Sequence, residues 1–66
     1  MTLTQQEIFN HVQKHSGLSY LELFEDVGQP RGLNIMDVHE TVQALEKLGL
    51  VREEHTIPNG YVVVAA

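Results

Sequence analysis

The stretch that decides the fold is residues 34–65, NIMDVHETVQALEKLGLVREEHTIPNGYVVVA. It reads as a capped helix, a stop and a two-stranded hairpin. Asn34 is a favoured N-cap, and Asp37 stands three residues later, where the helix dipole favours an anion. Gly49 stops the helix. Pro58-Asn59-Gly60 is a strong hairpin signal, because Asn and Gly accept the positive φ that tight turns require.

The helix predicted over Ile35–Leu48 has a clear amphipathic period. At 100° per residue, one side carries the apolar residues Ile35, Val38, Val42, Leu45 and Leu48. The opposite side carries Met36, His39, Glu40, Gln43 and Lys47. We therefore expect the apolar set to turn inward and the other set to form an outer side.

Two strands are predicted after this helix, over Leu50–Ile57 and Tyr61–Ala65. Their pairing through the Asn59-Gly60 turn makes an antiparallel hairpin. Which face of Tyr61 to Val64 is buried stays open, because both faces of that run are apolar.

A first helix is predicted over Gln5–His15, before this unit. Thr4 and Glu7 fit a capping box at its start, in which a hydroxyl and a carboxylate satisfy backbone amides reciprocally. Its apolar stripe is Ile8, Phe9 and Val12.

A shorter second helix is predicted over Tyr20–Asp26, with Ser19 and Glu22 as its capping box. Its buried residues are expected to be Leu21 and Phe24, with Leu23 as a further candidate. The following segment, Val27–Gly32, contains two glycines and a proline, so it is predicted to be a loop.

The order helix, helix, helix, strand, strand is that of a winged helix-turn-helix domain, an α+β fold, here over residues 1–66. The segment 42–52, VQALEKLGLVR, resembles the passage from recognition helix to wing in small bacterial and archaeal winged-helix transcriptional regulators. The resemblance is specific for architecture and identifies no subfamily.

The resemblance implies a partner and a set of contacts. In such regulators the third helix enters the major groove of double-stranded DNA, and the hairpin touches an adjacent groove or the backbone. The residues that would bind nucleic acid here are Arg31, Met36, His39, Glu40, Gln43, Lys47, Arg52 and Asn59. Arg31, Lys47 and Arg52 would be the phosphate contacts if they share one face.

The charge of the chain favours a different ligand. Acidic side chains outnumber basic ones nine to four, and acidity repels phosphate backbones. Three phosphate contacts would give a salt slope near about −3, which is weak for one copy. A homodimer would double those contacts. The alternative is a protein-interaction module that does not bind DNA and whose acidic surface favours a basic partner. A third interpretation is that these polar groups are only the solvated side of an amphipathic helix.

Other kinds of chemistry find little support in the sequence. His11 and His15 are one helical turn apart and could share a zinc or nickel ion, but no third ligand is evident, so no metal or cofactor is predicted. No nucleophile with a base and an orienting group, and no phosphate-binding loop, is present, so we expect no enzyme. With no cysteine, signal peptide or membrane span, a cytoplasmic protein is expected.

Overall fold

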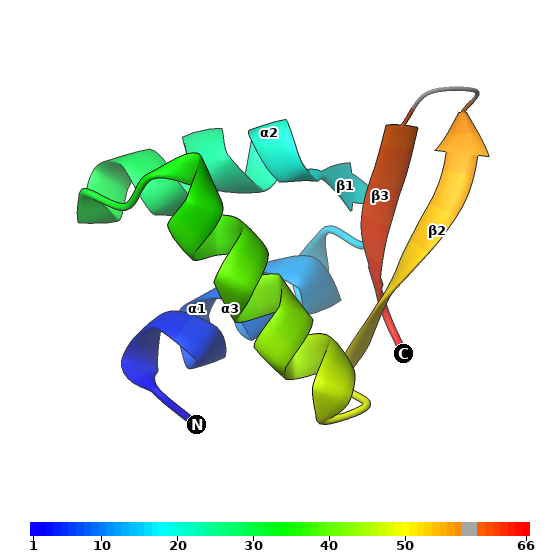
Figure 1. Ribbon diagram of the computed structural model, residues 1–66, viewed down its shortest axis with the longest axis horizontal. Helices are drawn as coiled ribbons and strands as arrows, with labels where there is room; N and C mark the ends of the chain where they lie inside the picture. The colour runs from blue at the N-terminus through cyan, green and yellow to red at the C-terminus, as the bar shows by residue number, and fades with distance from the viewer. Residues whose placement is uncertain (58–59) are drawn as a thin grey trace.

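The computed structural model describes residues 1–57 and 60–66. In chain order the elements are α1 (Leu3–Lys14), β1 (Leu18–Ser19), α2 (Tyr20–Leu23), η1 (Phe24–Gly28), η2 (Gln29–Arg31), α3 (Ile35–Lys47), β2 (Val51–Ile57) and β3 (Gly60–Ala65). Figure 1 shows the helices on one side and the β2–β3 hairpin on the other. The predicted α+β arrangement of helices followed by an antiparallel hairpin is confirmed, and it is consistent with a winged-helix layout.

The first helix begins earlier than predicted. The cap expected at Thr4 is wrong, because Thr2 and Gln5 form the capping box of α1, with hydrogen bonds of 2.9 and 3.1 Å. The glutamine side chain accepts from the Thr2 amide as a glutamate would. The earlier start lengthens the helix and leaves the Glu7 carboxylate available for a more distant partner.

The other two caps are confirmed. Ser19 with Glu22 caps α2, and Asn34 with Asp37 caps α3, each through a reciprocal pair of hydrogen bonds of 2.9 to 3.2 Å. Satisfied amides at both starts fix where α2 and α3 enter the fold.

The segment after α2 stays helical, so the loop predicted over Val27–Gly32 is wrong. The π-helical turn η1 and the 3₁₀ turn η2 continue to Arg31, and Gly32 ends the segment at φ +74°. Pro30 fits because it stands in the first turn of η2, where an amide hydrogen has no helical partner. Gly28 keeps a helical φ of −67° and lies against α3, so it supplies space rather than a turn.

The core lies where α1, α3 and the sheet meet, with the end of α2 and η1 closing it. Its buried side chains are Ile8, Val12, Leu23, Val27, Val38, Val42, Leu45, Val51 and Val63. Phe9 and Phe24 are half-buried against it.

The prediction that Leu21, Leu48 and Ile35 are buried in the core is wrong. Leu21 and Leu48 are 61% and 60% exposed, and Ile35 is 38% exposed. Leu48 stands at the C-cap of α3, and Ile35 is the first residue of that helix, so both lie beyond the turns that the core covers. In α2, Leu23 takes the buried position that Leu21 was expected to fill.

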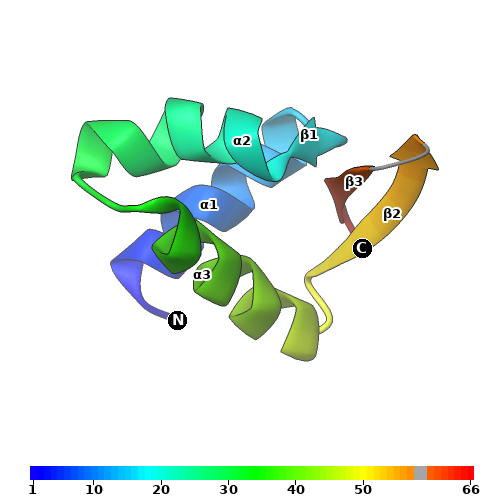
Figure 2. The ribbon, with the colours of Figure 1, turned by 45° about the horizontal axis from the view of Figure 1, so that its top comes forward.

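The sheet has the strand order β1-β3-β2 in the described part of the chain. Glu53 stands opposite Val63 and Val51 opposite Ala65, and the register shifts between Glu54 and Ile57. The short strand β1 was not predicted, because two residues show no periodicity; it pairs with Val62 and Val63. The open question about β3 is answered by Val63, whose side chain is fully buried. Figure 2 shows α1 behind α3 and the sheet to one side of both.

Candidate functional site

The outward side of α3 presents four exposed side chains: Met36, Glu40, Gln43 and Lys47. We call these four residues the outer α3 face. The Asn34 cap fixes the start of the helix, and Val38, Val42 and Leu45 are buried on the opposite side. The face therefore has a rigid support, and its chemistry is mixed: one thioether, one carboxylate, one amide and one ammonium group. Whether it binds nucleic acid stays a prediction.

His39, the fifth residue predicted for this side, lies differently. Its ring is half-buried and stacks on the ring of Tyr20, with the centroids 3.9 Å apart and an angle of 7° between the planes. The stack joins α3 to the start of α2. His39 therefore contributes to packing between these helices rather than standing free beside Gln43.

Tyr20 brings further acidic groups close to this stack. Its hydroxyl is buried and forms no hydrogen bond of normal geometry with a described residue. Burial is the main reason that the pKa of Tyr20 is raised above its usual value, and the carboxylates of Glu53 on β2 and Glu46 on α3 raise it further. The flank of α3 that faces the sheet is therefore acidic.

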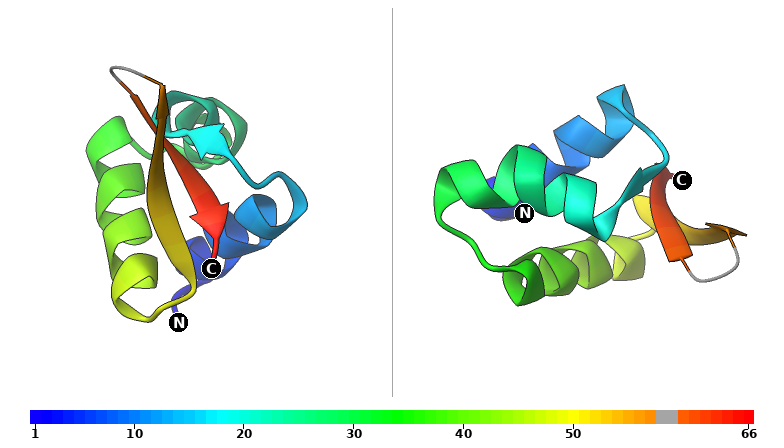
Figure 3. Two further views of the ribbon diagram at one scale, coloured as in Figure 1. Left: turned by 90° about the vertical axis from the view of Figure 1, so that its right-hand side faces the viewer. Right: turned by 90° about the horizontal axis from the view of Figure 1, so that it is seen from above.

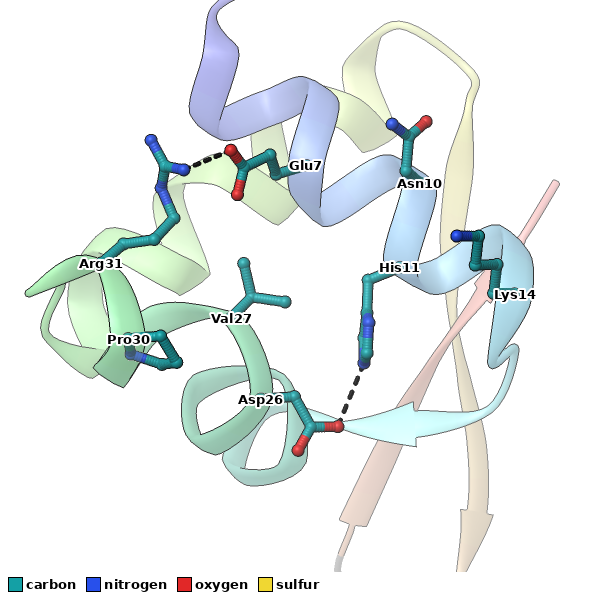
Figure 4. A pocket seen from close by; sticks show the side chains of 8 residues that line it. All are labelled: Glu7, Asn10, His11, Lys14, Asp26, Val27, Pro30 and Arg31. Atoms are coloured by element: carbon teal, nitrogen blue, oxygen red, sulfur yellow. Dashed lines mark hydrogen bonds and ion pairs between the residues drawn. The ribbon is translucent and has the colours of Figure 1, made fainter.

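The basic residues do not gather on the outer α3 face. The Arg31 guanidinium donates to the Glu7 carboxylate on α1, so the expectation that Arg31, Lys47 and Arg52 share one face is wrong for Arg31. Figure 4 shows Arg31 pointing at Glu7 across a groove between α1 and the η1–η2 segment. Sequence reasoning had no signal for this pair, whose members are 24 residues apart.

Arg52 is also paired, although it stays exposed. Its Nη2 atom lies 2.9 Å from Oε2 of Glu54 on the same strand. Lys47 is the remaining cation near the outer α3 face, and it makes no ion pair with any residue that the structure describes. Asn59, the predicted wing contact, lies outside the described residues.

The groove between α1 and η1–η2 has a volume of about 260 Å³. An ion pair between Glu7 and Arg31 crosses it, and so does a hydrogen bond between His11 and Asp26, with 3.0 Å between Nε2 and Oδ2. Glu7 and His11 are one helical turn apart, and the nearly buried side chain of Val27 lies between the two pairs (Figure 4). These two contacts join α1 to the η1–η2 segment, and we call them the clasp.

His11 and His15, the weak candidates for a metal site, belong to the same region. His11 bonds to Asp26, and its ring centroid is 4.9 Å from that of His15. Among residues 1–57 and 60–66, no group of three histidine or acidic side chains is placed to hold a metal ion.

Comparison with known proteins adds no family to this description. No family model matches the chain, and no curated protein is similar enough to it to be counted as a relative. Within the described residues, no helix has the length and apolar character needed to cross a bilayer.

Proposed function

We propose that this chain is a winged-helix recognition module that binds a protein partner with a basic surface through the outer α3 face. The observation that carries the proposal is the position of Arg31. The cation that a DNA interface would need in front of α3 is instead paired with Glu7 of α1, in the groove between α1 and the η1–η2 segment.

The charges that remain around α3 point the same way. Glu40 and Glu46 are exposed and make no ion pair with a described residue, and Lys47 is the one base that stands among them. A negatively charged surface attracts basic groups and repels phosphates. Neutralising phosphates is the main source of affinity for DNA, so an acidic face is poorly suited to it.

Met36 supplies the apolar part of the proposed contact. It is 62% exposed at the N-terminal end of a face made otherwise of polar residues. Methionine is flexible and polarizable, and it adapts to irregular partner surfaces. The proposal assigns binding to this face and no catalytic step.

The test compares two variants with the same change of charge. Glu40→Lys alters the outer α3 face, whereas Glu25→Lys alters an exposed position on η1 away from it. Immobilised parent and Glu25→Lys protein are expected to retain the same basic protein from cells that express the chain, and Glu40→Lys protein is expected to lose it. Equal retention by all three would refute the proposal.

DNA binding is the second candidate, and a specific observation favours it. Gln43 and Lys47 are both exposed one turn apart on the outer α3 face, where glutamine can read adenine and lysine can contact phosphate. With Lys47 and Arg52 as the phosphate contacts, the salt slope on duplex DNA would be about −2. Titration of random duplex DNA at low and physiological salt measures this slope. Binding that Lys47→Ala weakens at low salt would favour DNA over a protein partner.

A further inference from the structure

The outer edge of β2 is a second surface beside α3. In the order β1-β3-β2, β2 stands at the side of the sheet opposite β1, and no described strand pairs with its outer edge. Figure 3 shows β2 lying between β3 and α3, so this edge and α3 lie on the same side of the hairpin. An unpaired edge presents backbone donors and acceptors to any strand that can reach it.

The register decides which residues offer these groups. The Ala66 amide donates to the Leu50 carbonyl at 3.1 Å, which sets the hydrogen-bonding phase between β2 and β3. Arg52 and Glu54 lie two and four residues after Leu50, opposite Val64 and Val62. The backbone N–H and C=O groups of Arg52 and Glu54 therefore face β3, as the Leu50 carbonyl does. In an antiparallel pair the alternate residues point the other way. The N–H and C=O groups of Val51 and Glu53 are therefore directed outward.

The side chain of Glu53 gives this edge its chemical preference. It stands opposite the buried Val63, so its carboxylate lies on the face of the sheet turned toward the helices, near Tyr20. It is half-buried, and its hydrogen bonding and charge contribute to the raised pKa of Tyr20. It forms no ion pair with a described residue. Glu46, at the end of α3, acts on the same tyrosine and lies on the same side. A cation arriving along the edge would meet both carboxylates.

We propose that an extended segment of the partner adds to the sheet as a strand along the outer edge of β2, with a lysine or arginine opposite Glu53. The inference rests on the proposed function, since it specifies how a basic protein partner would be held. Main-chain hydrogen bonds to Val51 and Glu53 supply affinity, and the carboxylate supplies selectivity. A second copy of the chain is disfavoured at this edge, because like charges would stand opposite each other.

The test uses two synthetic peptides, one alternating valine with lysine and one alternating valine with glutamate. Amide hydrogen exchange followed by NMR reports directly on the outward N–H groups. The lysine peptide is expected to slow exchange at Val51 and Glu53, and the glutamate peptide to leave both amides unchanged. Fast exchange at Glu53 in the presence of bound lysine peptide would overturn the inference.

Three variants at one position separate the main chain from the charge. Glu53→Pro removes the outward N–H without touching the bonds to β3, a place where an edge strand tolerates proline. It should weaken the lysine peptide about tenfold, as expected for one lost hydrogen bond together with a lost charge. Glu53→Gln keeps the N–H and should weaken it only a few-fold. Glu53→Lys serves as the test if the Glu53→Pro protein does not fold. It should make the domain bind the glutamate peptide more tightly than the lysine peptide.

The outcomes distinguish this inference from the proposed function. If Glu53→Pro folds and holds the lysine peptide as tightly as the parent, edge addition is refuted, whereas loss of the natural partner on Glu40→Lys would still support the proposed function. If both amides are already protected in concentrated protein without peptide, a second copy occupies the edge and the assignment to a partner falls.

Discussion

Gly28→Ala tests how closely η1 lies against α3. A Cβ atom at this position would stand 3.0 Å from Cγ2 of Val38 and 3.1 Å from Cδ1 of Phe24. Both distances are tighter than ordinary van der Waals contact. Gly28 has a helical φ, so alanine meets no backbone strain there. The effect on stability therefore comes from two opposing terms, backbone entropy and crowding.

The crowding term should win. Replacing a helical glycine by alanine contributes about 0.5–1 kcal/mol to stability through the unfolded chain. Overfilling a packed core costs about 1–3 kcal/mol. Phe24 is half-buried and can turn, but Val38 is fully buried and, being β-branched on a helix, has one favoured rotamer. We expect a net loss of about 1 kcal/mol, which lowers the Tm of a domain of this size by roughly 4–8 °C.

A double-mutant cycle with Val38→Ala identifies the contact. In the Val38→Ala background the nearest atom is gone, so Gly28→Ala should become neutral or stabilising, a coupling of about 1–2 kcal/mol. Urea unfolding followed by circular dichroism measures all four proteins. Gly17→Ala is the control: its φ of +94° makes alanine strained, nothing lies within 4 Å, and its cost should be equal in both backgrounds. The close packing of Gly28 against Val38 would be refuted if Gly28→Ala raised the free energy of unfolding of the parent protein. It would also be refuted if Gly28→Ala lowered that free energy equally in the Val38→Ala background.

Three further predictions address the core, the buried hydroxyl and the clasp. Leu45→Ala should cost about 2–5 kcal/mol of unfolding free energy, whereas Leu48→Ala should stay within about 0.5 kcal/mol; equal losses in urea titrations would contradict the burial of the two residues. Tyr20 has a raised pKa in the folded state, so the unfolded state loses the phenol proton at a lower pH. Stability should therefore fall as the pH rises above the ordinary tyrosine pKa of 10.0. In the Tyr20→Phe variant, urea midpoints measured on either side of that pH should fall less. Arg31→Ala should lower the free energy of unfolding by less than about 1 kcal/mol, because the ion pair of Arg31 with Glu7 is partly exposed. The same variant should retain the partner and bind DNA as the parent does, and a large loss of binding would place Arg31 at the interface.

The parts of the fold that the sequence predicts are those fixed by neighbours along the chain. The caps at Ser19 and Asn34 depend on residues three positions away, and both were found as predicted. The buried side of α3 follows from its period over three turns. The cap predicted at Thr4 was wrong because Thr2 with Gln5 forms an equivalent capping box two residues earlier. The local sequence does not favour one of these two boxes over the other.

The errors lie where a contact from another element decides the outcome. Gly28 and Pro30 mark a loop by composition, but Gly28 has a helical φ and its lack of a side chain lets η1 lie close to Val38 of α3. For the candidate site, the outward set on α3 was predictable from periodicity. The withdrawal of His39 to Tyr20 and of Arg31 to Glu7 was not, because each partner comes from a distant segment.

The two proposed surfaces would act at different stages of binding. Charges on the outer α3 face act over a distance, so Glu40 should mainly affect the rate of association and its dependence on salt. Hydrogen bonds at Val51 and Glu53 form only after a strand has reached its register, so they should mainly affect dissociation. An acidic face by itself would attract many basic proteins with little discrimination. A requirement for an extended segment with a cation opposite Glu53 adds geometry to charge, and it would let a small acidic domain select one basic partner among many.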